Sequence, residues 1–283
     1  ASGLKSDAIK LDVTITSNEI ALKPWNELVP MLTTYDLSGA AKLDAKAWGT
    51  VEKPQYGGTF QIKDLSAKAP NLKAQPKIEA LVKIATDKIE AMSLTMNAPG
   101  NDVKVTGRVV SFTAPNIDID VKSTQMDLDQ LVEFPKTPAK TEAKAKEAPA
   151  APAGDKKAGK ATASGSASAS GEDMDKALDP LRENKIAAAT KAQVNFNIGM
   201  LKAKNIKMTN MHGKMSFKDL DFAVESFNMG LFNGTIKASA NVAMKPKTPT
   251  YRFSTEVSKL DLKTAVESQF DAFKNTLLGQ ANF

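Results

Sequence analysis

Cysteine is absent from this chain of 283 residues, and histidine occurs once, as His212. The absence of cysteine excludes disulfides, thiolate metal sites and cysteine nucleophiles, and it leaves the redox compartment undecided. A single histidine excludes a metal cage built from several histidines and a histidine relay. His212 lies in a stretch that is typical of a turn, 210–213, so we interpret it as a solvent-exposed turn residue.

Long hydrophobic runs and aromatic residues are also scarce. No stretch of about 18 apolar residues exists, so no helix is expected to span a membrane. Aromatic residues make up 6% of the sequence and are not interleaved with arginine, whereas nucleic-acid recognition usually gathers Arg and Lys on one face. No nucleophile elbow, zinc motif or paired catalytic acid signature is visible. We therefore expect no enzyme, no nucleic-acid partner and no cofactor.

Two pairs of carboxylates and one pair of glycines have residue types that occur in ligand sites. Asp118 with Asp120 and Asp127 with Asp129 are two residues apart, a spacing that shares a face in a strand. A calcium loop needs more Asp or Asn together with a glycine, so no metal is expected, and Asp127 is predicted to cap a helix. Gly57-Gly58 is too short for a phosphate loop and predicts a bulge or turn.

One long segment has a composition unlike the rest. Residues 135–171 contain no Ile, Leu, Val, Phe, Met, Tyr or Trp. Such a segment cannot bury enough apolar surface to offset its chain entropy, so it is predicted to be a disordered linker. Its seven lysines and three acidic residues leave +4 of the chain's net +6. The positive charge therefore describes the linker more than a binding patch.

On both sides of this segment, apolar and polar residues alternate, as in half-buried strands. The alternation covers residues 9–15, 103–109, 117–121, 194–198, 236–244 and 251–257. Turn residues at 97–102, 210–213, 232–234 and 246–249 separate the runs. Residues 76–96 fit either a helix or two strands that turn near Thr86 and Asp87, and the neighbouring strands favour two strands. The whole pattern predicts an antiparallel meander.

Short helices are expected at three places. Residues 24–32 carry Pro24 at a plausible first helical position. Residues 127–132 give one or two turns. Residues 261–278 have Asp261 as a cap, an apolar stripe on one side and Gly279 at the end.

An internal repeat links these elements. Two segments place an Asp-Leu pair twelve residues after a proline, and a looser third copy runs from Pro54 to Asp64-Leu65; the two close copies are Pro115-Asn116-Ile117 to Met126-Asp127-Leu128 and Pro249-Thr250-Tyr251 to Leu260-Asp261-Leu262. A strand marked by Gly39, Gly107 or Gly234 precedes each copy. Repeated strand–helix units of this kind stack and expose a continuous face.

These motifs, in this order, resemble the AsmA family of bacterial envelope proteins, especially its C-terminal AsmA-like domain. The resemblance is carried by Leu231-Phe232-Asn233-Gly234-Thr235-Ile236 and the proline and Asp-Leu motifs after it, by Met126-Asp127-Leu128-Asp129-Gln130-Leu131 just before the linker, and by the alternation in 181–222. It covers residues 90–283, and residues 1–90 more weakly.

The resemblance implies a long sheet curled into a groove with an apolar interior, in a family associated with lipid traffic and outer-membrane assembly. We therefore expect a mainly β fold with short helices, an antiparallel meander curled into an elongated amphipathic groove of repeated strand–helix units. The expected parts are groove repeats in 1–134, a linker in 135–180, and a truncated AsmA-like C-terminal β repeat with a terminal helix in 181–283.

Family members usually carry an N-terminal inner-membrane helix and further C-terminal strands. Neither pattern occurs here, so the chain is expected to be an excerpt of a periplasmic protein that is tethered to the inner membrane. Contact with the membrane would then be made by the parts that the excerpt lacks.

Few helices are expected to cover many amphipathic strands, which favours a groove open to lipid; the alternative is that the same side chains form an ordinary closed core. The candidate groove residues are Ile9, Leu11, Val13, Ile15, Val103, Val105, Val109, Ile117, Ile119, Val121, Val194, Phe196, Ile198, Ile236, Val242, Met244, Tyr251, Phe253 and Val257. Methionines cluster after the linker, and flexible thioethers suit varied acyl chains but also fill cores.

The function expected from this reading is non-enzymatic. The groove would bind or conduct phospholipid, or another acyl-chain lipid, between the inner and outer membranes and so support outer-membrane assembly. The alternative is a structural or assembly scaffold that acts with envelope protein partners on outer-membrane protein targeting, without lipid transport.

Overall fold

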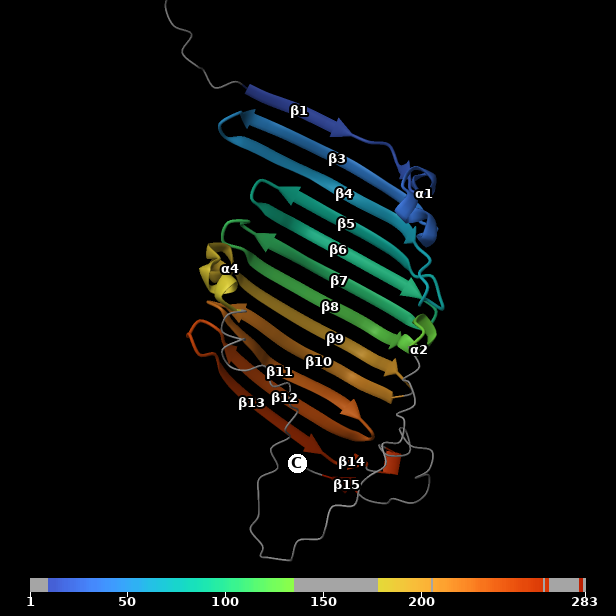
Figure 1. Cartoon of the computed structure of the whole chain (residues 1–283), viewed down its shortest axis with the longest axis vertical. Helices are drawn as coiled ribbons and strands as arrows, with labels where there is room; N and C mark the ends of the chain where they lie inside the picture. Colours follow the sequence, from blue (N-terminus) through green and yellow to red (C-terminus); the bar gives the residue numbers. More distant parts are fainter. Residues whose placement is uncertain (1–9, 135–177, 205, 262, 265–279, 282–283) are drawn as a thin grey trace, which may run out of the picture.

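Thirteen strands form a single curled, open sheet in the computed structural model, which describes residues 10–134, 178–204, 206–261, 263–264 and 280–281 (Figure 1). The strands of this sheet are β1 (Lys10–Thr16), β2 (Ile20–Ala21), β3 (Ser38–Thr50), β4 (Pro54–Ser66), β5 (Lys77–Ala85), β6 (Lys88–Ala98), β7 (Asn101–Val110), β8 (Asn116–Asp127), β9 (Lys191–Ala203), β10 (Ile206–Lys218), β11 (Asp221–Leu231), β12 (Gly234–Ala243) and β13 (Thr250–Ser258). A second, small sheet pairs β14 (Leu260–Asp261) with β15 (Gln280–Ala281).

Strands that are neighbours in the sequence are neighbours in the sheet. The path runs from β1 through β3 to β13, and β2 pairs with β3 beside it. Tight turns make this order possible: Phe232 and Asn233, between β11 and β12, both have positive φ, 45° and 59°, as in the hairpin turns that match strand twist. The predicted elongated sheet of antiparallel hairpins is therefore confirmed.

One pair departs from the predicted antiparallel pattern. β8 and β9 pair in parallel, in unbroken register from Asn116↔Lys191 to Ser123↔Ile198. A parallel partner requires the chain to return across the full length of the strand, which only a long connection can do. The segment that separates β8 from β9 in the sequence is the longest connection in the chain, and it contains the compositionally distinct residues 135–171.

Two other local predictions had different outcomes. Residues 76–96 do form two strands, β5 and β6, and the turn between them contains Asp87 with a φ of 60°. The turn predicted at 210–213 is wrong, because these residues lie inside β10. Asn210 has a φ of 50° and the β10–β11 register shifts there. Asparagine tolerates positive φ, so the strand absorbs an irregular residue without reversing. His212 is exposed, as expected, but on a strand.

The bulge or turn predicted at Gly57-Gly58 is also wrong. Both glycines lie within β4 and pair in regular register with Lys46 and Ala45 of β3. A Cβ atom on Gly58 would lie 2.4 Å from the carbonyl oxygen of Asp44. Gly58 is therefore required by the close approach of two backbones rather than by a change of direction.

Short helices lie beside the ends of the strands and not across the sheet (Figure 1). They include α1 (Trp25–Leu28), the 3-10 helix η1 (Pro30–Tyr35), α2 (Leu128–Leu131) and α4 (Lys185–Ala189). The predicted helices at 24–32 and 127–132 are thus confirmed. Residues 263 and 264 are helical, but most of the predicted helix 261–278 and of the predicted linker lies outside the described residues. Within the described part of the chain, no helix is long and apolar enough to cross a membrane.

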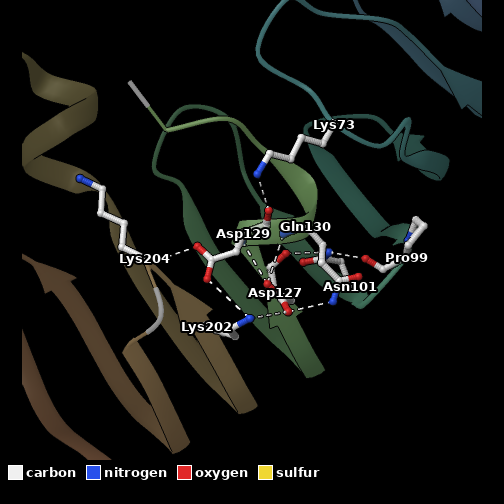
Figure 2. Close-up of polar contacts among 8 residues, drawn as sticks. All are labelled: Lys73, Pro99, Asn101, Asp127, Asp129, Gln130, Lys202 and Lys204. Atoms are coloured by element: carbon white, nitrogen blue, oxygen red, sulfur yellow. Dashed lines mark hydrogen bonds and ion pairs between the residues drawn. The ribbon is translucent and has the colours of Figure 1, made fainter. Parts of the chain in front are cut away.

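The end of β8 is fixed by a network of polar contacts around Asp127 (Figure 2). The Asp127 carboxylate accepts hydrogen bonds from the backbone N–H groups of Asp129 and Gln130, at 3.1 and 3.2 Å, and so caps α2 as predicted. The Gln130 amide donates a further bond at 2.9 Å. The Asp127 side chain is 8% exposed, and the ammonium group of Lys202 lies 3.4 Å from it.

The same network joins the two sides of the parallel pair. Lys202, on β9, also lies 3.6 Å from the carboxylate of Asp129. The backbone N–H of Lys204 donates to the Asp129 carboxylate at 2.6 Å. Lys73, in the loop before β5, donates to the carbonyl oxygen of Asp129 at 2.8 Å. The cap of one short helix therefore fastens β9 and an earlier loop to the end of β8.

The predicted repeat has a structural counterpart at Asp261. The Asp261 carboxylate accepts bonds from the N–H groups of Lys263 and Thr264, just as Asp127 does from the two residues at the start of α2. Its backbone N–H bonds to the carbonyl of Phe232, and that of Asp127 bonds to Gly100. In both copies the Asp therefore ends a strand, caps a helical turn and is anchored to the preceding hairpin.

We predict that Asp127→Ala lowers the free energy of unfolding by about 1–2 kcal/mol, because it removes a helix cap and leaves partly buried donors without their acceptor. Asp127→Asn should recover part of this loss, since asparagine also caps helices. Urea unfolding followed by circular dichroism measures the change. The control is Asp12→Ala, which removes only an exposed ion pair with Lys46 and should cost less than about 0.5 kcal/mol. Equal losses for the two alanine variants would contradict this role of Asp127.

Acid should weaken the wild-type fold through the same group. Burial raises the pKa of Asp127, but hydrogen bonds from Gln130 and Lys202 outweigh it and hold the pKa below its ordinary value. A carboxyl with a lowered folded-state pKa stabilises the fold above its unfolded pKa and loses this contribution as the pH falls through the folded value. Between about pH 5 and pH 2, the free energy of unfolding should therefore decrease less for Asp127→Ala than for the wild type. Parallel profiles would contradict this.

Candidate functional site

An uninterrupted apolar surface crosses the sheet at right angles to the strands. Residues directly opposite each other on paired strands lie on the same face, so the register defines rows of side chains. Row A is Ile15, Ala45, Gly58, Ile84, Ile89, Val109, Ile117, Ala192, Phe217, Phe222, Val242 and Tyr251. It runs from one edge strand to the other without a charged residue.

Two further rows lie beside it on the same face. Row B is Leu43, Phe60, Val82, Met92, Gly107, Ile119, Val194, Met215, Val224, Ala240 and Phe253; row C is Ala41, Ile62, Ala80, Leu94, Val105, Val121, Phe196, Gly213, Phe227, Ala238 and Thr255. Tyr251 and Thr255, both on β13, are the residues with a polar group among the three rows. We call the surface formed by rows A, B and C the apolar face.

The opposite face of the sheet is polar. One of its rows contains Glu79, Thr95, Lys104, Lys122, Asn197, His212, Asn228, Lys237 and Glu256. Ion pairs on it join adjacent strands, such as Arg108 with Asp118 at 2.8 Å and Lys214 with Glu225 at 2.8 Å. Exposed pairs of this kind contribute little stability, but they keep this face hydrated.

No second layer covers the apolar face within the described residues. The buried apolar residues there are Leu131 and Leu220, and neither belongs to the three rows. By contrast, Phe253 is 72% exposed and Ile15 is 55% exposed. A surface of this size left open in a protein normally marks a binding site. The described strands therefore form an open face and not the closed core considered as the alternative.

The face is hollowed near its β1 end. An apolar hollow of about 230 Å³ lies over β1, β3, β4 and β5, and Val13, Ile15, Leu43, Ala45, Ala47, Tyr56, Gly58, Phe60 and Ile84 are among the residues that line it. We call it the β1–β5 hollow. The described residues hold no cluster of His, Asp, Glu or Cys suited to a metal ion.

Glycines within the rows make space for large neighbours. In row C, Gly213 of β10 lies between Phe196 and Phe227, whose ring centroids are 6.0 Å apart. A Cβ atom on Gly213 would lie 2.6 Å from the Phe196 ring and 2.7 Å from the carbonyl oxygen of Ser226. The glycine thus lets two rings from different strands meet above a third strand.

The structure brings nearly all predicted groove residues to the same face. Those on β1, β7, β8, β9, β12 and β13 belong to the three rows or extend their alternation, as Leu11, Val13, Val103 and Val257 do. Met244 follows the end of β12, and its N–H bonds to the carbonyl of Leu220. Ile9 lies outside the described residues. Contact of these side chains with lipid stays a prediction.

The sequence reading missed the contribution of β3 to β6. Leu43, Phe60, Val82, Met92 and Leu94 lie in rows B and C but were not among the candidates. Alanines and glycines weaken the alternation in β3 and β4, and β5 and β6 also fitted a helix. The available signal was the alternation of Phe60 with Ile62 and of Met92 with Leu94. Of the methionines noted after the linker, Met215 lies in row B.

A model of the AsmA family matches residues 61–283. The chain belongs to the AsmA family. The match extends from β4 to the end of the chain, so it includes most of the apolar face and both Asp127 and Asp261. AsmA proteins are a family of the bacterial cell envelope. No curated protein and no solved structure matches the chain.

We predict that Gly213→Val lowers the free energy of unfolding of this AsmA-family protein by about 1–3 kcal/mol, because the new side chain overlaps a backbone carbonyl and the Phe196 ring. Chemical denaturation measures the loss. The control, Ala238→Val, enlarges a residue of the same row on the open face and should change stability by less than about 0.5 kcal/mol. A neutral Gly213→Val variant would contradict the packing described for row C.

Proposed function

We propose that this AsmA-family protein binds the acyl chains of phospholipid on its apolar face and conducts them between the inner and outer membranes, in support of outer-membrane assembly. The observation that carries the proposal is the continuity of the apolar face, in which row A runs from β1 to β13 and rows B and C run from β3 to β13. The proposed location is the periplasm, with the full-length protein tethered to the inner membrane.

The chemistry of the face suits acyl chains. Each methylene group that leaves water for an apolar surface gains about 0.8 kcal/mol, and the three rows offer Val, Ile, Leu, Met and Phe at almost every strand. No charged side chain belongs to these rows, so the polar headgroup keeps its hydration in solvent while the chains lie on the face. The cost of desolvating an unpaired headgroup would otherwise oppose binding.

The dimensions of the face suit conduction. Twelve strands follow one another along the sheet, and because neighbouring strands lie ~4.8 Å apart, the face is roughly 50 Å long. This exceeds the hydrocarbon thickness of a bilayer, which is ~30 Å. Because the same residue types recur at each step, an acyl chain meets a similar environment along the path, which avoids a deep free-energy well that would stop it.

The proposal predicts that the purified chain retains phospholipid, detected by mass spectrometry of organic extracts, and that a charge on the apolar face prevents this. Phe60→Glu should reduce retained lipid by about tenfold, because an ionised carboxylate in an acyl-chain site must be desolvated. Gln61→Glu adds the same group one residue along β4, opposite Lys42 on the polar face, and should retain lipid at the wild-type level.

A second pair of variants, on β13 at the opposite end of row B from Phe60, tests whether lipid binds along the whole apolar face or only near β4. Phe253→Glu should also lower lipid retention, whereas Ser254→Glu, its neighbour on the polar side of β13, should not. Circular dichroism and thermal unfolding establish that the variants fold. Wild-type protein that is folded and free of lipid, or equal retention by the paired variants, would contradict the proposal.

A second candidate function is supported by the position of β13, the last strand along the described sheet. This nine-residue strand pairs with β12 in regular register, and no described strand pairs with its other side. An outermost strand can accept a further strand from another protein. An assembly scaffold would then capture an envelope protein partner through β13 while its apolar face stays free of lipid, which the same extracts distinguish from the first function.

A further inference from the structure

We propose that the β1–β5 hollow is a distinct site for one acyl chain of a phospholipid, where a lipid is held more firmly than on the rest of the apolar face. The inference rests on the proposed function, because it assigns a preferred position to the lipid that the face binds. It goes beyond that function in naming a site and the part of the lipid that fills it.

The hollow is built by the contrast between small and large residues. Ala45, Ala47 and Gly58 form its floor, where β3 and β4 approach so closely that Gly58 has no room for a Cβ atom. Larger side chains on the surrounding strands form its walls, among them Ile15 of β1, Phe60 of β4 and Ile84 of β5. An acyl chain in the hollow therefore contacts apolar residues of four strands, β1, β3, β4 and β5.

The lining determines which chemistry fits. The charged residue of the lining, Lys46, directs its ammonium group to Asp12 at 3.1 Å. The remaining residues are apolar apart from the Tyr56 hydroxyl and Thr59, so a charged headgroup would lose its hydration without a partner. An apolar cavity of 150 Å³ binds benzene, and the hollow, at about 230 Å³, has space for a longer part of a hydrocarbon chain.

Continuity with the rows favours a long chain over a compact apolar molecule. Gly58 of the floor leads along row A to Ile84 and Ile89, and Phe60 of the wall leads along row B to Val82 and Met92. A chain that starts in the hollow can therefore continue onto the apolar face without crossing a polar group. The site should accept phospholipids irrespective of their headgroup.

The experiment fills the hollow without adding charge. Phosphatidylcholine with a diazirine group in the middle of one acyl chain is presented in vesicles to the purified chain, irradiated, and located by mass spectrometry of peptides. Wild-type protein should give its highest labelling in β3 to β5. Ala45→Phe should reduce this labelling by about fivefold or more, since the added ring occupies the hollow. Ala240→Phe makes the same change in row B, far from the hollow, and should leave the labelling of β3 to β5 unchanged.

Replacing phosphatidylcholine by phosphatidylglycerol with the same acyl group should give the same labelling pattern. Labelling spread evenly over the apolar face, or unaffected by Ala45→Phe, would overturn the hollow as a site while leaving the proposed function intact. Labelling that follows the headgroup would overturn acyl-chain recognition in the hollow. No labelling of folded protein by either lipid would overturn both the proposed function and this inference.

Discussion

Cross-strand register is the constraint on which the rest of this molecule depends. In an antiparallel ladder, residues that lie opposite each other are on the same face. The alternating apolar residues of one strand therefore continue an apolar row only if each neighbouring strand pairs in the matching register. A slip of one residue at any pair would interrupt rows A, B and C and expose charged groups in the path. The hairpin turns, the glycines and the polar contacts around Asp127 and Asp261 all help to maintain this register.

The junction between β8 and β9 is the place where phase is hardest to maintain, because no hairpin turn connects these strands. Here the register depends on side-chain and backbone contacts between two strands that are separated by a long connection in the sequence. Lys202 and the backbone of Lys204 meet the carboxylates of Asp127 and Asp129 at one end of the pair, and Asn195 donates to Asp120 further along. These polar contacts take the role that a two-residue turn plays elsewhere in the sheet.

Much of the fold could be predicted from the sequence, for a physical reason. Alternation in residues 103–109 or 251–257 reports a half-buried strand directly, and the Asp-Leu motif reports a helix cap because a carboxylate at that position satisfies free N–H groups. Three features were not predictable in this way. The parallel pairing of β8 and β9 depends on a contact between distant segments. The strand across Asn210 depends on a positive φ that a turn would also use. The close packing at Gly58 depends on the neighbouring backbone.

The β1–β5 hollow depends on that same packing of β3 against β4. The sequence therefore predicted its lining residues on β1 but not those on β3, β4 and β5.

The single parallel pair also determines the polarity of the sheet's two long borders. Strand direction reverses from each strand to the next in an antiparallel sheet. Between β8 and β9 it does not reverse, because these two strands are parallel. As a result β4, β8 and β13 all run the same way, and the Asp-Leu motifs at Asp64, Asp127 and Asp261 fall along one border of the groove, on the side of α1 and α2 (Figure 1). With β9 antiparallel to β8, the Asp261 corner would have moved to the opposite border. The sheet therefore has one border that carries the three Asp-Leu motifs and another formed mainly by hairpin turns, so the apolar face lies between two chemically different borders.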